Sequence, residues 1–472
     1  MKLFARRDEN ILEGKLLPKI IYFVLPLMLT NLLQVLYNAA DMVVVGLSDT
    51  EGALGSIGTT GAMINLILNI FMGFSIGTNV VVAKNIGKGD REATEKAVHT
   101  SLLLGLFLGI VCMIVGIFIS RPTLALLGDQ GTILDLATKY TVIYFIGVPF
   151  ISLTNYLIAI FRAKGDTMTP LYILTATGLL NVGLNLLFVL AFKMDVDGVA
   201  WPTVISNIAS TVLFGISLSR SESWCKLNFR KLKIDKTALK SILFVGLPAG
   251  VQGALFSLSN MLIQSSIITV NNTLCPGGSD IIDGNTAASS LEGFAYTAQN
   301  SVYQAAVTFT SQHYGAKKYE RIKKVIADCY LVTFVIAFLA GGIIILLRDP
   351  LVSIYSVRSE LAVKAAMTRI FIMMIPYFTL AFMETGSGIL RGLGKSLTST
   401  IVSLVGICIL RVLWIFTVFA KYQTLESVFI SYPLSWTATA AVHFALSMIV
   451  LHRLIRNSKK NDVKIAEEAG EK

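Results

Sequence analysis

The segment 24–41 reads VLPLMLTNLLQVLYNAAD, and the segment 246–263 reads GLPAGVQGALFSLSNMLI. Each is a long apolar stretch with a Leu-Pro pair near its start, and Asn38 of the first stands opposite Asn260 of the second. Offsets of 222 to 231 residues relate further landmarks of the two halves, namely Pro149 to Pro376, Arg162 to Arg391, Gly165 to Gly394 and Pro202 to Pro433. The chain is therefore an internal duplication, and duplicated membrane halves that meet at a central cleft are typical of secondary transporters.

The composition places the chain in a membrane. Hydrophobic residues make up 54% and charged residues 15% of the chain, whereas soluble domains carry about 25% charged residues. Apolar stretches long enough to cross roughly 30 Å of hydrocarbon occupy residues 20–47, 56–83, 97–120, 137–161, 170–192, 198–219, 239–271, 286–313, 324–347, 363–390, 396–420 and 427–452. We predict an all-α polytopic membrane protein with twelve transmembrane helices in two pseudo-symmetric six-helix lobes.

The predicted domain organisation follows these spans. An N-terminal lobe covers residues 1–219, a cytoplasmic linker 220–240, a C-terminal lobe 241–456 and a charged tail 457–472. The linker is basic, which is consistent with an amphipathic helix on the lipid headgroups or with a solvated loop held by anionic lipid. The tail is polar and expected to be disordered. The first span has no small-residue cleavage site, so we expect no cleavable signal peptide.

The distribution of Lys and Arg predicts the orientation. When loops are assigned alternately to two sides, one side holds 31 basic residues and the other 7. The positive-inside rule then places both termini and the linker in the cytoplasm, and we expect a multi-pass protein of the inner (plasma) membrane. The net charge of +11 therefore reflects topology, and we predict no nucleic-acid partner.

Cofactor and enzyme signatures are missing from the sequence. The five cysteines are scattered without metal-ligand spacing, the four histidines form no HxxxH or HExxH pair, and no Walker-type loop occurs. We therefore expect no cofactor, no metal other than a coupling ion and no ATP hydrolysis. An intramembrane enzyme would need a paired-acid metal motif or a nucleophile–base pair at the loop ends, and neither is present.

The first span carries a polar stripe on one helical face. Its members, spaced three, four and three residues apart, are Asn31, Gln34, Asn38 and Asp41. In the second half Asp41 is replaced by Ile263. Packing symmetry therefore does not require the acid, which favours a functional role over a structural one.

A carboxylate in a membrane requires a proton or a set of cation ligands. Asn181 and Asn185 lie one turn apart on the fifth span, and Thr203 follows the kinking Pro202 on the sixth. With Asp41 they fall in the external half of the membrane, and Asn155 lies at a similar depth on the fourth span. Oxygen ligands with one carboxylate suit Na⁺ or H⁺; interhelical hydrogen bonding is the structural alternative for the asparagines.

The second half has charges of its own inside the spans. They are Glu292, Arg369, Glu384, Arg411 and His443. Two acids and two arginines could neutralise one another as structural pairs. Alternatively, one acid is a second protonation site or contacts a substrate cation, and Gln34, Asn38, Glu292, Glu384 and Arg411 are our candidates for the substrate cleft.

Several motifs resemble those of the multidrug and toxic compound extrusion (MATE) family over nearly the whole chain. They are Tyr-Asn-Ala-Ala-Asp-Met-Val-Val-Val-Gly at 37–46, Ala-Lys-Asn-Ile-Gly-Lys-Gly-Asp at 83–90, the paired turns at 161–167 and 390–396, Asn-Val-Gly-Leu-Asn at 181–185 and Gly-Val-Ala-Trp-Pro-Thr at 198–203. The resemblance implies a twelve-helix antiporter that expels organic cations and amphipathic drugs in exchange for Na⁺ or H⁺.

The resemblance also implies roles for residues. In DinF-like members a first-span aspartate and polar residues of spans five and six form the coupling site, which carries over to Asp41, Asn181, Asn185 and Thr203, with Asn155 added. Pro26 matches a proline whose kink is linked to switching. NorM-type members have second-half acids where this chain has Phe256 and approximately Leu380. The chain is therefore closer to the DinF-like type, and H⁺ is favoured over Na⁺.

The functional prediction is a monomeric secondary antiporter that works by alternating access. Its partners would be amphipathic or cationic small molecules and the lipid bilayer. The alternative is a flippase or exporter of a lipid-linked or other amphipathic metabolite, which would be expected to have more cationic residues in its cleft.

Overall fold

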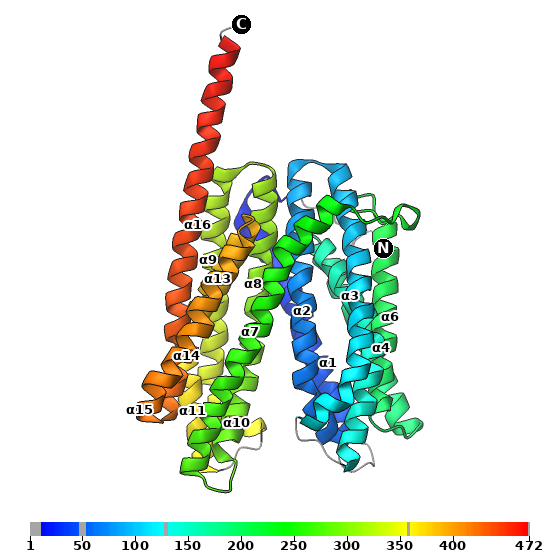
Figure 1. Cartoon of the computed structure of the whole chain (residues 1–472), viewed down its shortest axis with the longest axis vertical. Helices are drawn as coiled ribbons and strands as arrows, with labels where there is room; N and C mark the ends of the chain where they lie inside the picture. The colour runs from blue at the N-terminus through cyan, green and yellow to red at the C-terminus, as the bar shows by residue number, and fades with distance from the viewer. Residues whose placement is uncertain (1–10, 47–52, 127–130, 356–358, 471–472) are drawn as a thin grey trace. The chain divides into compact units, whose positions relative to one another are not determined.

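The computed structural model describes residues 11–46, 53–126, 131–355 and 359–470, and the secondary structure in these ranges is entirely helical (Figure 1). The helices of the first half are α1 (Leu16–Gly46), α2 (Ala53–Lys88), α3 (Arg91–Leu126), α4 (Gly131–Ala163), α5 (Met168–Leu186) and α6 (Asp197–Ser219). Those of the second half are α7 (Lys236–Leu274), α8 (Asp280–Gly315), α9 (Tyr319–Leu346), α10 (Arg348–Ile354), α11 (Glu360–Met374), α12 (Tyr377–Gly392), α13 (Ser396–Ser403), α14 (Leu410–Trp414), α15 (Ala420–Tyr422) and α16 (Leu425–Gly470).

Short π-helical turns interrupt two of the spans. The π-helix η1 (Leu187–Ala191) extends α5, and η3 (Leu404–Ile409) and η4 (Ile415–Phe419) separate α13, α14 and α15. Each of these turns falls within the fifth or the eleventh predicted span, which are counterparts in the duplication. Both halves thus depart from regular α-helix in the same repeated element.

All twelve predicted spans coincide with helices, and the predicted fold class is confirmed. In the described ranges, nine helices are long and apolar enough to cross a membrane, and the bent pair α11–α12 makes a tenth. The remaining two spans correspond to α2 and α8, each of 36 residues. α8 is rich in polar residues such as Gln299 and Gln304, and both of these side chains are buried.

The repeated prolines have different effects in the two halves. Pro149 lies inside α4, which continues through it. Its counterpart Pro376 stands at a break, where α11 and α12 meet at a bend of 50°. A proline lacks the N–H group for the helix ladder and its ring crowds the carbonyl four residues earlier, so each of these positions is a site where a span can bend.

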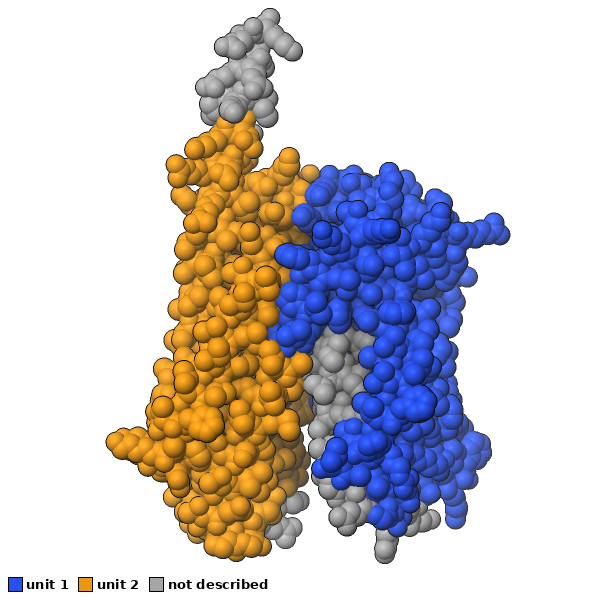
Figure 2. Space-filling view, viewed as in Figure 1, with its two compact units in different colours: residues 1–10, 25–253 blue, residues 11–24, 254–472 orange. Residues whose placement is uncertain are grey.

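The chain divides by its internal contacts into two compact units (Figure 2). In the described ranges, unit 1 is 25–253 and unit 2 is 11–24 with 254–470. The chain therefore passes from one unit to the other inside α1, next to Pro26, and inside α7, five residues after Pro248. In this division the first part of α1 belongs to unit 2 and the first part of α7 belongs to unit 1. The lobe boundaries predicted from the sequence, at 219 and 241, remain a prediction.

Glycines allow close helix packing inside each unit. A Cβ at Gly105 of α3 would lie 2.7 Å from the Tyr156 ring of α4. In unit 2 a Cβ at Gly386 of α12 would lie 2.8 Å from Cβ of His443 on α16. The His443 ring is fully buried there and lies 3.0 Å from the Met383 carbonyl oxygen. We therefore assign His443 to the packing of α12 on α16.

The structure shows neither an amphipathic helix in the linker nor a disordered tail in the described residues. Between α6 and the start of α7 at Lys236, the linker contains the short 3₁₀ helix η2 (Phe229–Lys231) and packs on α3. The backbone N–H of Asn228 donates to Nε2 of His99 at 3.2 Å, and Leu227 is buried. These contacts satisfy backbone groups that a headgroup-bound helix would bond internally. The tail continues α16 as far as Gly470, because its residues extend an existing helix at no nucleation cost.

Candidate functional site

The Asp41 carboxylate of α1 is held by an amide of α5. The Nδ2 group of Asn185 donates to Oδ1 of Asp41 at 2.5 Å. The same Nδ2 lies 3.3 Å from Oδ1 of Asn181, one turn earlier on α5. Both asparagine side chains are buried, whereas Asp41 is half-buried. Two residues spaced four apart on one helix therefore present their amides to a single acid on another.

Asn181 links this pair to α6. Its Nδ2 donates to Oγ1 of Thr203 at 3.4 Å. When the amide oxygen and nitrogen of Asn181 are exchanged, Nδ2 donates to Oδ1 of Asp41 at 2.9 Å and the oxygen accepts from the Thr203 N–H at 3.3 Å. The Thr203 side chain also donates to the Val199 carbonyl at 3.0 Å, beside the kinking Pro202. The structure thus brings together all four residues that sequence reasoning placed at the centre of the site.

The site contains a negative charge without a positive partner. Among the described residues no ion pair involves Asp41, and the largest favourable interaction of its carboxylate is with Asn185. The Oδ1 atom of Asn185 is buried and accepts no hydrogen bond in the described structure. A lone carboxylate beside an unused amide oxygen is suited to take up H⁺ or a small hard cation such as Na⁺.

Two tyrosines that sequence reasoning missed border the site. Tyr140 and Tyr144 lie one turn apart on α4, with ring centroids 6.3 Å apart and stacked. The charge of Asp41 acts on both hydroxyls. Tyr140 packs in a buried apolar cluster with Val44 and Val45, the residues that follow the acid on α1. Their spacing of four residues in the fourth span, which places both on one helical face, was the sequence signal that could have identified them.

Two features of α5 fix its position against α1. A Cβ at Gly178 would lie 1.9 Å from the Tyr37 ring, so only glycine allows this approach. The Tyr37 hydroxyl in turn donates to the Thr175 carbonyl at 3.4 Å. On the other side of Asn185, α5 passes into the π-helical turn η1, a distortion that is frequent at functional sites. The amides are therefore positioned by one tight contact and one irregular turn.

Other predicted members do not join the cluster. Asn155 donates its Nδ2 to the Ile151 carbonyl of its own helix at 2.9 Å. Gln34 and Asn38 lie on the exposed part of α1, although they share a face with Asp41. Pro26 lies inside α1, and its carbonyl accepts from Oγ1 of Thr30 at 2.8 Å. None of the described hydrogen bonds of Asn155 or of the residues around Pro26 involves the Asp41 carboxylate.

The charges of unit 2 are arranged differently. Arg369 forms an ion pair with Glu292 at 2.6 Å and donates to Oδ1 of Asn285 at 2.6 Å. Arg411 donates to Oγ of Ser435 at 3.0 Å, and its guanidinium lies 4.1 Å from the centroid of the Tyr432 ring. Glu292 is therefore paired with an arginine, as one of the two possibilities required, and its structural role stays a prediction.

Glu384 lies apart from this pair. No ion pair of the described residues joins it to Arg411. Its charge acts instead on Tyr296 and Arg391. Counted back seven residues from the turn arginines Arg162 and Arg391, Asn155 of the first half corresponds to Glu384 of the second. The duplication thus has an amide in one half where the other has an acid.

Comparison with known proteins shows which family and which relatives this chain is similar to. The family model MatE matches residues 26–187 and 248–417. The probable multidrug resistance protein YoeA of Bacillus subtilis is 25% identical over 443 residues, which is 91% of each chain. The probable multidrug resistance protein NorM of Thermotoga maritima is 24% identical over 88% of this chain and 89% of its own. The multidrug export protein MepA of Staphylococcus aureus is 24% identical over 55% of this chain and 58% of its own.

Solved structures share the fold. An outward-facing MATE family transporter of the MOP superfamily superposes with a TM-score of 0.87 at 21% identity, covering 96% of this chain and 99% of its own. A MOP superfamily transporter from Pyrococcus furiosus, described as having a binding pocket of reversed polarity, gives a TM-score of 0.87 over 95% and 99% of the two chains. At this identity the likeness establishes the fold.

Proposed function

The chain belongs to the MATE family of multi-pass membrane transporters, and on that premise we propose that it exports amphipathic or cationic small molecules in exchange for a coupling ion bound at Asp41. Its relatives are transporters, and it is not an enzyme. The observation that carries the proposal is the uncompensated carboxylate: Asp41 is bonded to buried amides and has no cationic partner among the described residues.

Ion uptake would act through the hydrogen bonds at the site. Charged Asp41 accepts strongly from the Asn185 amide, because hydrogen bonds to ionised groups are about twice as strong as neutral ones. Neutralisation by H⁺ removes that advantage and frees α1 from α5. The consequence would reach Pro26, where α1 passes from one compact unit to the other. In this proposal, binding of the coupling ion changes the bend of α1 and drives alternating access.

We propose H⁺ as the coupling ion. In the observed arrangement amide nitrogens point at the carboxylate and the Asn185 oxygen points away from any donor. This arrangement favours a charged acid that is waiting for a proton. Binding of Na⁺ would require the Asn185 amide to turn so that its oxygen faces the ion, since Na⁺ needs oxygen ligands.

The test is efflux of a fluorescent organic cation from proteoliposomes under an imposed gradient. An inward-directed pH gradient in Na⁺-free buffer is expected to drive export, and a Na⁺ gradient at equal pH to add little. If neither gradient drives export by the parent protein, the antiport proposal is wrong. We further propose a plasma-membrane protein with both termini in the cytoplasm, on the basis of the distribution of basic residues. We also propose that it works as a monomer.

A further inference from the structure

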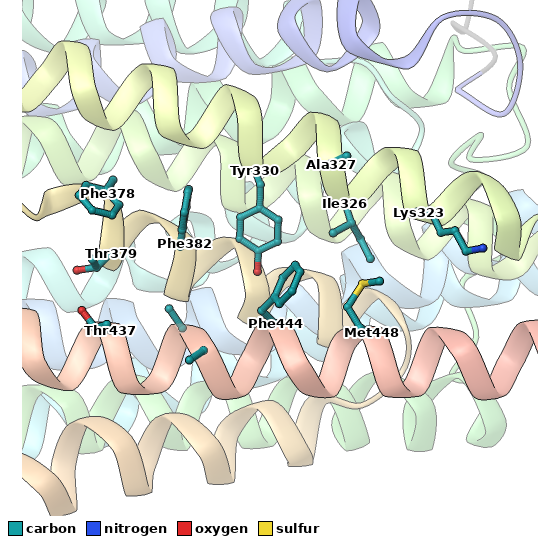
Figure 3. Close-up of a pocket in the computed structure, with 12 residues that line it drawn as sticks. Lys323, Ile326, Ala327, Tyr330, Phe378, Thr379, Phe382, Thr437, Phe444 and Met448 are labelled. Carbon is teal, nitrogen blue, oxygen red and sulfur yellow. The ribbon is translucent and has the colours of Figure 1, made fainter.

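Unit 2 contains a long apolar groove between α9, α12 and α16 (Figure 3). Its volume is about 620 Å³. The lining residues are Lys323, Ile326, Ala327, Tyr330, Phe378, Thr379, Phe382, Thr437, Ala440, Ala441, Phe444 and Met448. The groove is separate from the charged residues Glu292, Arg369 and Arg411, none of which lines it.

An aromatic row forms the wall of the groove. The Tyr330 ring packs edge-on against Phe382 and Phe444, with ring centroids 5.1 and 5.7 Å apart. The ring centroids of Phe382 and Phe378 lie 5.8 Å apart. Phe444 is 48% exposed and Phe378 is 37% exposed, so the groove is open along one side. Such a surface in a membrane protein contacts an apolar chain.

Apart from Tyr330, the polar residues of the groove stand at its two ends (Figure 3). Thr379 and Thr437 lie at one end. Their hydroxyls donate to the backbone carbonyls of Pro376 and Pro433 at 2.8 and 2.7 Å. Lys323 lies at the other end. In the middle of the groove the Tyr330 hydroxyl is the polar group, and it has no hydrogen-bond partner in the described structure. A single cation marks one end.

That end has an excess of positive charge. Oε2 of Glu320 lies 2.8 Å from Nζ of Lys323, and Oε1 of the same carboxylate lies 3.5 Å from Nζ of Lys459. One acid is thus shared by two lysines that are 54% and 73% exposed. This is the end to which the excess of basic loops belongs, where anionic lipid headgroups are concentrated.

We propose that the groove binds an anionic phospholipid of the cytoplasmic leaflet, with its phosphate at Lys323 and Lys459 and an acyl chain along the aromatic row. The dimensions fit, since Thr437 to Met448 spans about 16 Å of helix and one leaflet contributes about 15 Å of hydrocarbon. A transported organic cation fits less well, because no acid lines the groove and its charged end would repel a cation.

The duplication supplies a matched surface without these features. With the offset of 228 between Gly87 and Gly315, Lys323 corresponds to Glu95, an acid that pairs with Lys231 at 3.4 Å. With the offset of 231 between Pro202 and Pro433, Phe444 corresponds to Leu213, which is 41% exposed. The two positions are similar in exposure, but an acid stands where the groove has Lys323, so Leu213 is a built-in control.

The test is fluorescence quenching by brominated lipids in liposomes that contain the full-length protein. The variants Phe444→Trp and Leu213→Trp each add one tryptophan, and the signal of the parent is subtracted. Dibrominated phosphatidylglycerol is compared with dibrominated phosphatidylcholine. We expect the Phe444→Trp variant to prefer phosphatidylglycerol by about fivefold, and the Leu213→Trp variant to show no preference.

Two further variants attribute the effect to the groove. Lys323→Gln with Lys459→Gln, in the Phe444→Trp background, should reduce the preference to about twofold or less, because both cations near the phosphate are removed. Ala440→Phe should lower quenching by both lipids, because it fills the groove. Equal quenching by the two lipids in the Phe444→Trp variant would overturn the proposal, as would a preference that the lysine changes leave intact. Displacement of the lipid by a fluorescent organic cation would also contradict it, by showing a substrate pocket.

Discussion

Asp41 of unit 1 and Glu292 of unit 2 are both carboxylates inside helices, and their partners differ. In unit 1 Asp41 is bonded to the Asn185 amide and has no ion pair among the described residues. In unit 2 Glu292 forms a 2.6 Å ion pair with Arg369. An acid paired with an arginine carries no net charge together with its partner. An unpaired acid inside a membrane is costly unless it takes up a proton or another cation. We propose that ion coupling takes place at Asp41 in unit 1 and that the arginine holds Glu292 in unit 2. A second carboxylate of unit 2, Glu384 of α12, also has no ion pair among the described residues.

The same difference is visible between the repeated spans five and eleven. With the offset of 229 between Gly165 and Gly394, Arg411 corresponds to Val182, one residue after Asn181. Both spans contain π-helical turns at this level. The first half therefore uses this irregular element to present amides to an acid, and the second uses it to hold a guanidinium against Tyr432 and Ser435. One scaffold thus holds two kinds of polar site.

The largest expected effect is that of removing the unpaired charge. Asp41→Asn keeps the volume and hydrogen bonding of the side chain but cannot exchange an ion, so we expect loss of concentrative export down to the level of empty vesicles. The measurement is ethidium efflux from energised intact cells with matched expression. Glu292→Gln is the control acid and should retain export in its folded fraction. Equal loss in both variants would remove the distinction between the two units.

The paired charge should instead determine stability. Glu292→Gln leaves Arg369 buried without its carboxylate, and we expect a loss of about 3 kcal/mol in the free energy of unfolding. Thermal unfolding of the purified protein measures this loss. Changing both partners to methionine should restore most of the stability, because an apolar pair of similar size carries no unpaired charge. A double variant as unstable as the single one would mean that Glu292 is held by more than its arginine.

The contact between α1 and α5 gives an intermediate effect. Gly178→Ala places a Cβ against the Tyr37 ring, and overpacking of this kind costs about 1–3 kcal/mol. We expect a roughly tenfold slower export with normal protein levels, since Asn185 would move away from Asp41. Tyr37→Leu in the same chain removes the overlapping ring atoms and should recover most of the rate. If it does not, the glycine serves some purpose other than bringing the two helices together.

The sequence predicted the twelve spans because apolar length and proline position are local properties. It also predicted the association of Asp41 with Asn181, Asn185 and Thr203, whose depth in the membrane follows from helix rise alone. It could not predict the rotation of each helix about its axis. Asn155, for example, bonds the backbone of its own helix and not the acid.

The sequence also could not predict which residues pair over long distances along the chain. Glu292 and Arg369 are 77 residues apart, and their contact depends on the register of α8 against α11. The packing of the linker on α3 depends on distant residues in the same way. Its basic residues dominate its composition, but the few residues that pack on α3, such as Leu227 and Asn228, determine its structure.

The smallest expected effect concerns Asn155. Because its amide bonds the Ile151 carbonyl and not the acid, Asn155→Ala should change the export rate by no more than about twofold. The same efflux assay measures it. A loss approaching that of Asp41→Asn would show that α4 turns towards the site in another state of the cycle.

The most direct test of the central claim is export by purified protein in proteoliposomes under a pH gradient imposed in Na⁺-free buffer, with the parent and Asp41→Asn compared in parallel. The account predicts that the parent moves a fluorescent cation against its concentration gradient and that the variant moves it only downhill. Stimulation by Na⁺ at constant pH that is lost in Asp41→Asn would change the coupling ion while keeping the site. Concentrative export by Asp41→Asn at the parent's rate would contradict the account.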